Sequence, residues 1–183
     1  MKIAVLISGT GSNLKALLEA QKQKEFESEI VLIVSNRKAK GLEYGKEYGI
    51  PAVIIKEDEE LLRTLGEYGV DFIVLAGYLK TISSKILESY KDRIINIHPS
   101  LLPKYGGKGF YGIRVHEAVF KNKDETSGVT VHYVNEEVDG GEIILQETLN
   151  ISHCKNPEEI AECVLKLEHS TLKRAIKKIE EEK

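Results

Sequence analysis

An amide and an imidazole stand two residues apart in residues 95–103, at the end of an apolar run and before two prolines. Residues i and i+2 of a strand point to the same face of a sheet, so Asn96 and His98 should face one site together. Imidazole titrates near neutrality, and His98 could act as an acid, a base or a cation facing a developing oxyanion. Ligand crevices of open α/β sheets form at such strand ends, which makes this pair the first candidate site.

A glycine-containing turn, Ser-Gly-Thr-Gly-Ser-Asn at residues 8–13, lies between the first apolar run and a helical pattern. Free backbone N–H groups at a helix start bind anions. The turn differs from the dinucleotide fingerprint, because Leu14 occupies the third glycine position and residues 35–37 lack the acidic residue that would bind a ribose. A single phosphate therefore fits better than a nicotinamide cofactor, and the alternative is a turn that only reverses the chain.

Two further segments hold weaker candidates. In residues 75–82, Leu79 and Ile82 could pack against a flat heterocycle, although a tight strand-to-helix connection is the better explanation of the segment taken alone. Asp139 belongs to an Asp-Gly-Gly sequence that is typical of a hairpin turn. Its carboxylate gains a chemical role only if it reaches His98, where we expect it to raise the pKa of the imidazole.

The elements that must position these residues follow from the apolar pattern. Short runs rich in β-branched residues, without polar alternation, predict buried parallel strands at residues 3–7, 30–34, 52–55, 72–76 and 94–97. Helical patterns separate these runs. The first helix should be capped by the side chain of Ser12 or Asn13.

The second half predicts two longer strands, at residues 128–134 and 142–149, and a final helix after Asn156-Pro157 whose end, residues 180–183, should be frayed. The chain is therefore expected to be an α/β protein. Its sheet should be doubly wound and mostly parallel, mixed at one edge and flanked by helices.

Composition narrows the class of protein. With 183 residues, 42% hydrophobic and 30% charged residues, the chain is expected to form one domain over residues 1–183. A net charge of −3 without a basic stripe argues against a nucleic-acid partner. Neither a signal peptide nor a membrane-length apolar stretch is present, so we expect a cytoplasmic protein with no membrane contact. Cys154 and Cys163 lack the spacing of a disulfide framework or a metal site, and no metal is expected.

Together these segments resemble the phosphoribosylglycinamide formyltransferases, a family of the folate formyltransferase superfamily. The resemblance extends from Met1 to about Thr171 and rests on five motifs in order: ISGTGSNL, LAGYLKTI, INIHPSLLPKY, SGVTVHYVNEEVDGGEIILQ and the Leu-Glu-His of the last helix. It implies a Rossmann-like formyltransferase fold. It also implies transfer of a formyl group from 10-formyltetrahydrofolate, as co-substrate, to the amine of 5'-phosphoribosylglycinamide in purine (IMP) biosynthesis, without a metal.

The same resemblance implies a role for individual residues. Asn96, His98 and Asp139 correspond to a catalytic trio, and His116 to a supporting histidine. The substrate phosphate and ribonucleotide would be bound by Gly11, Ser12, Asn13 and Glu168. The residues implied to bind the folate are Leu79, Lys80, Thr81, Ile82, Asn96, Asn135, Glu136, Glu137, Val138 and Asp139.

The chain departs from many relatives in a longer glycine-rich loop at residues 105–111 and in Lys80, which replaces an arginine. Residues 56–63 are shortened, and Arg63 is a candidate contact for the folate tail. The alternatives are formyltetrahydrofolate hydrolase, another folate-dependent formyltransferase acting on tRNA or a sugar nucleotide, and a nucleotide-binding module without catalysis. The oligomeric state is open between a monomer and a homodimer.

Overall fold

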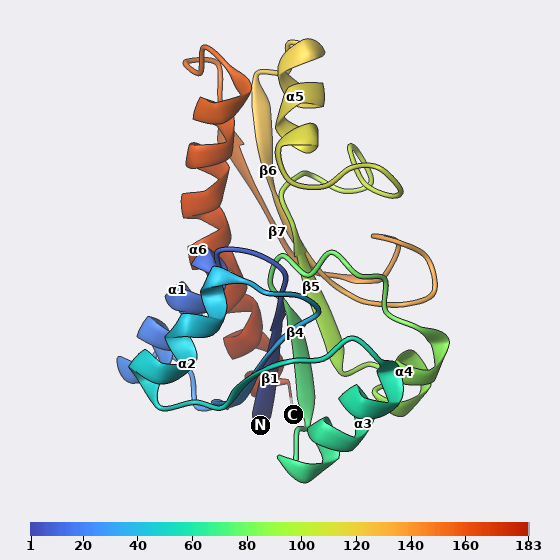
Figure 1. The fold of residues 1–183 in the computed structure, drawn as a ribbon. Coiled ribbons are helices and arrows are strands. Elements are labelled where there is room, and N and C mark those ends of the chain that lie inside the picture. The colour runs from blue at the N-terminus through green and yellow to red at the C-terminus, as the bar shows by residue number, and fades with distance from the viewer. Residues whose placement is uncertain (183) are drawn as a thin grey trace.

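The computed structural model describes residues 1–182, which form one mixed sheet with helices on both faces (Figure 1). The strand order is β3-β2-β1-β4-β5-β6-β7. The strand bounds are β1 (Lys2–Ile7), β2 (Glu29–Ser35), β3 (Ala52–Ile54), β4 (Phe72–Leu75), β5 (Ile94–His98), β6 (Thr126–Tyr133) and β7 (Ile143–Asn150).

The sheet has a parallel part and an antiparallel edge. β1 to β5 pair in parallel, whereas β6 runs antiparallel to β5 and β7 runs antiparallel to β6. The central strands are buried on both faces, as their β-branched runs predict, and β7 alternates between buried and exposed positions as an edge strand does. The predicted α/β class, the doubly wound sheet and the mixed edge are confirmed.

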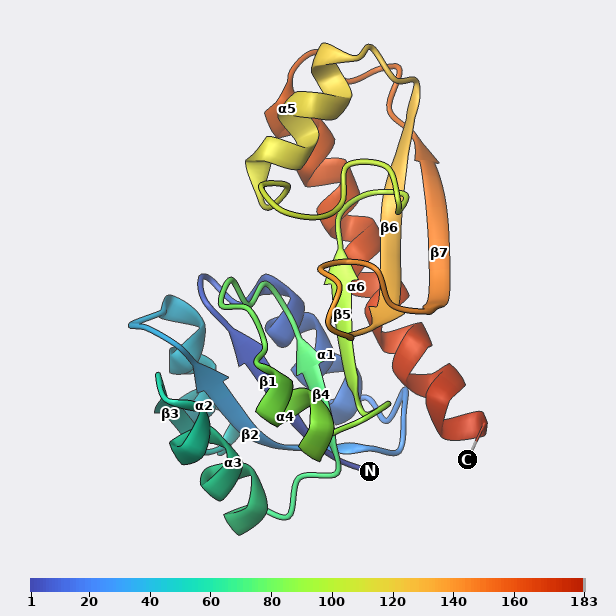
Figure 2. The ribbon, with the colours of Figure 1, turned by 90° about the vertical axis from the view of Figure 1, so that its right-hand side faces the viewer.

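The helices are α1 (Ser12–Lys22), α2 (Glu43–Tyr48), α3 (Asp58–Glu67), α4 (Ser84–Ser89), α5 (Ile113–Lys121) and α6 (Pro157–Glu181), with a short 3-10 helix, η1 (Lys40–Leu42). Side chains of α1 and of the second half of α6 pack on one face of the parallel strands, and those of α3 and α4 pack on the other. The first half of α6 packs with α5 and β6 in a separate cluster (Figures 1 and 2). No helix within the described residues is long and apolar enough to cross a membrane.

The start of α1 differs from the prediction. Its N-cap is Gly11, in the left-handed region at φ 74°, and no side chain caps the helix. A Cβ atom at Gly11 would lie 2.9 Å from Cα of Gly41, so the close approach of two backbones requires glycine here. The predicted cap by Ser12 or Asn13 is therefore wrong, and neither side chain is used to cap the helix.

The end of α6 also differs from the prediction. The helix continues to Glu181, and the carboxylate of Glu180 accepts hydrogen bonds from the backbone N–H groups of Glu27 (3.1 Å) and Ser28 (2.6 Å). Long-range contacts of this kind hold a terminus in place, so the expected fraying is wrong for residues 180 and 181. Lys183 lies outside the described residues.

Candidate active site

The site forms around the end of β5, where the sheet changes from parallel to antiparallel pairing. Asn96 and His98 lie on one face of β5, as their spacing predicts. In the antiparallel register with β6, Asn96 lies opposite His132 and His98 opposite Thr130. The register therefore adds a second imidazole, His132, to the predicted pair.

Asp139 reaches this pair from the loop between β6 and β7. Its backbone adopts the left-handed conformation, at φ 57°, which aspartate tolerates better than most residues. Its carboxylate lies 3.5 Å from Nδ1 of His98 and accepts a hydrogen bond of 2.9 Å from the Gly107 N–H. The contact that the sequence analysis requires of Asp139 is present.

The two nitrogens of His98 have different neighbours. Nε2 lies 2.8 Å from the Tyr105 carbonyl, which can only accept, so Nε2 carries a proton and Nδ1 is the atom that gains or loses one. Burial lowers the pKa of His98, while the Asp139 carboxylate and the Tyr105 carbonyl act to raise it. The effect expected of Asp139 is therefore present, but burial outweighs it, so the net pKa is lowered and His98 is neutral near pH 7.

Asp139 is ionised in the same setting. Burial raises the pKa of its carboxyl, but contacts with His132, His98 and the Gly107 N–H outweigh burial and leave the pKa below its ordinary value. The site therefore places a carboxylate against a neutral imidazole, and that carboxylate stabilises the imidazolium whenever His98 takes up a proton.

Asn96 and His132 complete the cluster. Nδ2 of Asn96 lies 3.2 Å from Nε2 of His132 and 3.5 Å from a carboxylate oxygen of Asp139. Nδ1 of His132 lies 2.8 Å from the Tyr133 carbonyl and carries its proton, so Nε2 accepts from Asn96. His132 is not among the predicted site residues, because only the antiparallel register of β6 brings it beside Asn96.

A cavity of about 600 Å³ opens in front of this cluster, within the range of small-molecule sites. Loops after β4, β5 and β6 converge there (Figure 2). Asn96, His98 and Asp139 all line it. Its other predicted lining residues are Leu79, Lys80, Thr81, Ile82, Glu137 and Val138, and residues 107–112 and Arg37 line it without having been predicted.

Some predicted folate contacts do not lie at the cavity. Asn135 and Glu136 are not among the lining residues, and Oδ1 of Asn135 instead accepts a hydrogen bond from the Glu137 N–H, which stabilises the turn. The exposed Arg63 pairs with Glu67 one helical turn away and does not line the cavity either. These three side chains therefore do not line the cavity, and their predicted contacts with the folate stay predictions.

Lys80 lies at the edge of the cavity and is already paired. Its Nζ is 3.0 Å from the Asp58 carboxylate and donates to the Lys56 carbonyl at 2.5 Å. An ammonium held in this way presents a point charge at the cavity mouth rather than the planar fork of an arginine.

The predicted anion site lies at the same edge of the sheet. Gly11, Ser12 and Asn13 follow β1, whose carboxyl end lies beside that of β4, and the Leu79 N–H donates to the Ser8 hydroxyl at 2.8 Å. None of the four predicted ribonucleotide residues lines the 600 Å³ cavity. The predicted ribonucleotide residues therefore lie outside the cavity, at the same edge of the sheet.

Asn13 and Glu168 come together although they lie at opposite ends of the chain. Burial raises the pKa of Glu168 to about 7, and a hydrogen bond from Asn13 partly opposes this rise. Oδ1 of Asn13 is buried without a hydrogen-bond partner. A buried acceptor of this kind is costly unless a ligand satisfies it, which supports a binding role for the pair.

His116, on α5, lies behind His98. It is buried, its Nδ1 has no hydrogen-bond partner, and burial together with the nearby His98 lowers its pKa to about 4. His116 is therefore a neutral neighbour of the cluster rather than a source of charge.

Comparison with known proteins agrees with this architecture. Residues 1–176 match the formyl transferase family. A chloroplastic phosphoribosylglycinamide formyltransferase of Arabidopsis thaliana is 40% identical over all of this chain, which spans 66% of that relative, a little under two thirds. The phosphoribosylglycinamide formyltransferase of Escherichia coli is 36% identical over 93% of this chain and 82% of its own length.

Solved structures have the same fold. The crystal structure of phosphoribosylglycinamide formyltransferase from Anaplasma phagocytophilum superimposes with a TM-score of 0.92 at 35% identity, covering 100% of this chain and 87% of that one. The family match covers nearly the whole sequence, including the segments that supply Asn96, His98, Asp139 and Glu168. The chain therefore belongs to the formyl transferase family.

Proposed function

We propose that this chain transfers the formyl group of 10-formyltetrahydrofolate to the primary amine of 5'-phosphoribosylglycinamide, a step of purine biosynthesis. The observation that carries the proposal is the cluster of Asn96, His98 and Asp139 at the wall of a 600 Å³ cavity, next to a helix start suited to a phosphate. The names of the relatives point to the same reaction.

The residues present fit both substrates. The cavity has an apolar side, with Leu79, Ile82 and Val138, and a polar end at the catalytic cluster, which suits a flat heterocycle that carries its reactive group inward. The first N–H groups of α1 suit the phosphate of the ribonucleotide. Asn13 and Glu168 offer an amide and a carboxyl to its hydroxyl groups.

The protonation states support a proton-transfer role for His98. Neutral His98 accepts a proton at Nδ1, and the ionised Asp139 stabilises the resulting imidazolium across 3.5 Å. The substrate amine must lose a proton as it attacks the formyl carbon, and the folate nitrogen must gain one as it leaves. In this proposal His98 takes the first proton and returns the second.

Asn96 supplies the oxyanion contact. The longer contact of Nδ2, 3.5 Å to Asp139, is the one that a negatively charged formyl oxygen would replace, while the 3.2 Å contact to His132 fixes the amide. A single oxyanion donor contributes about 3–4 kcal/mol to transition-state stabilisation. Orientation of two bound substrates supplies much of the remaining acceleration.

One assay separates this proposal from its alternatives. The protein is mixed with 10-formyltetrahydrofolate, with and without 5'-phosphoribosylglycinamide, and both folate deformylation and the formylated ribonucleotide are followed. Formyl transfer that requires the ribonucleotide is the expected result. Equal deformylation without it would indicate a hydrolase, and the absence of reaction in both mixtures would indicate a binding module.

A further inference from the structure

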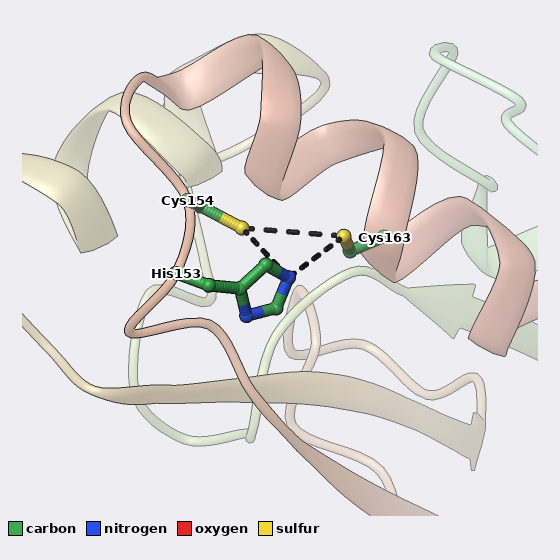
Figure 3. Close-up of side chains that lie close together, drawn as sticks. All are labelled: His153, Cys154 and Cys163. Carbon is green, nitrogen blue, oxygen red and sulfur yellow. Dashed lines mark hydrogen bonds between the residues drawn. The ribbon is translucent and has the colours of Figure 1, made fainter.

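A second group of chemically reactive side chains lies in the loop between β7 and α6, apart from the cavity. His153 and Cys154 come from this loop, and Cys163 comes from the second turn of α6 (Figure 3). None of the three lines the 600 Å³ cavity. The two cysteines lack the spacing of a metal site along the sequence. The fold nevertheless brings them together in space.

The distances between the three ligand atoms are nearly those of a metal site. The two sulfur atoms are 4.0 Å apart, and each lies 3.8 Å from Nε2 of His153. Tetrahedral Zn²⁺, with Zn–S of about 2.3 Å and Zn–N of about 2.0 Å, holds two sulfur ligands about 3.8 Å apart and a sulfur and a nitrogen about 3.6 Å apart. Shifts of a few tenths of an ångström would bring the three ligand atoms to the distances of a tetrahedral zinc site.

The ligands are held in place by the surrounding backbone. Before His153, the Ile151 N–H donates to the Glu125 carbonyl at 2.9 Å and the Ile151 side chain is buried. After Cys154, Oδ1 of Asn156 accepts from the Glu159 N–H at 2.8 Å, and the Glu159 carboxylate accepts from the Lys155 N–H at 2.8 Å. This reciprocal capping fixes the start of α6. The loop that carries His153 and Cys154 is therefore already ordered before a metal binds.

We propose that His153, Cys154 and Cys163 bind one Zn²⁺ or a similarly soft cation, with water in the fourth position. Two thiolates and an imidazole are the ligands that such ions prefer. The ion would bridge the β7–α6 loop to the part of α6 that precedes Glu168, and would act as a structural clamp. The site is independent of the proposed function, because none of its ligands lies at the catalytic cluster.

A disulfide is the competing use of the two cysteines. It would need the sulfur atoms to approach from 4.0 Å to about 2.05 Å, and it would leave the imidazole, equidistant from both, without a role. The arrangement of all three atoms favours the metal.

The test measures metal binding by the full chain. Reduced, chelator-treated protein is titrated with Zn²⁺ in competition with a chromophoric chelator, and with Co²⁺, whose thiolate charge-transfer and tetrahedral d–d absorption identify the ligands. One ion per chain is expected. Cys154→Ser, Cys163→Ser and His153→Ala should each weaken Zn²⁺ binding on the order of 100-fold or more, because even lost supporting contacts cost metal sites 10–100-fold.

Lys155→Ala is the matched control, since it alters an exposed side chain of the same loop without removing a ligand. Zn²⁺ should raise the Tm of the wild type and of this control, but not that of the Cys163→Ser variant. His153 is exposed, so His153→Ala should retain the circular dichroism of the wild type. This keeps the test decisive if a cysteine variant misfolds.

Two results would overturn the proposal. One is Zn²⁺ binding no tighter in the wild type than in His153→Ala or the Cys154→Ser, Cys163→Ser double variant. The other is a Co²⁺ complex without thiolate charge transfer. A chain purified without reductant that is two hydrogens lighter, and that binds no Zn²⁺ after reduction, would assign the cysteines to a disulfide instead.

Discussion

Nδ1 of His98 faces the carboxylate of Asp139 across 3.5 Å, and each residue is supplied by a different part of the sheet. His98 ends β5, whereas Asp139 belongs to the loop between β6 and β7. Burial lowers the pKa of the imidazole and the carboxylate opposes this change. The pair thus consists of a neutral imidazole and an ionised carboxylate that stabilises the imidazolium when His98 takes up a proton.

Loss of either member of this pair should abolish most of the turnover. For His98→Ala and Asp139→Asn we expect kcat to fall by about 10²–10⁴-fold, because general acid–base catalysis is typically worth that much. Steady-state formyl transfer measures the effect. Circular dichroism and ribonucleotide affinity should stay near wild type, and unchanged turnover in either variant would contradict the assigned roles.

The protonation of His98 can be followed directly. In Asp139→Asn the pKa of His98 should fall below its already lowered wild-type value, because the charge that opposes burial is gone. An NMR titration of the His98 ring protons reports both values. A higher pKa in the variant would show that the carboxylate does not stabilise the imidazolium.

Gly11→Ala should damage ribonucleotide binding selectively. The residue has φ 74°, and a Cβ would lie 2.9 Å from Cα of Gly41, so the turn must shift. A left-handed alanine costs roughly 1–2 kcal/mol before that contact is counted. We expect the KM for the ribonucleotide to rise about tenfold or more, with little change in the KM for the folate.

Gly9→Ala is the matched control for this substitution, because a Cβ at Gly9 meets no atom within 4 Å. Its kinetic constants should stay close to wild type. If the KM of Gly11→Ala for the ribonucleotide were as close to wild type as that of Gly9→Ala, the turn would tolerate a side chain and Gly11 would have no special role.

Glu168 should make stability depend on pH near neutrality. Burial raises its pKa to about 7, above about 4.3 in the unfolded chain, so the folded state binds its proton more tightly. The stability from this proton is complete below the unfolded pKa and is lost as the pH rises through 7. Glu168→Gln should therefore gain about 1–3 kcal/mol relative to wild type between pH 5 and pH 8.

Urea unfolding at the two pH values measures this difference. Glu162→Gln, at an exposed position of the same helix, is the control and should follow the wild type. A Glu168→Gln variant whose free energy of unfolding changes with pH as much as that of the wild type would place the titration elsewhere.

The sequence predicts what depends on local periodicity. The β-branched runs locate the strands within one or two residues, and the i, i+2 spacing places Asn96 and His98 on one face. What it misses depends on contacts distant in the chain. His132 joins the site through the register of β6, and Cys154 meets Cys163 through the turn into α6.

Two local features of the structure that the sequence does not predict have equally physical causes. The side chains of Ser12 and Asn13 resemble helix caps, but the close packing of Gly11 on Gly41 decides the start of α1. Asn135 resembles a ligand-binding residue of its motif, yet its amide is used within its own turn. In both cases the backbone geometry, which composition does not encode, determines the contacts that the side chain makes.

The length of α6 has a consequence for the unfolding of the molecule. Ile160 and Val164 belong to the cluster under α5 and β6, while Leu172 and Ile176 belong to the cluster under α1. One continuous helix thus joins the antiparallel edge to the parallel strands, and Glu180 ties its far end to the loop before β2. Amide protons of β6 and of β1 should therefore exchange with solvent in the same opening event, because neither half can release α6 alone.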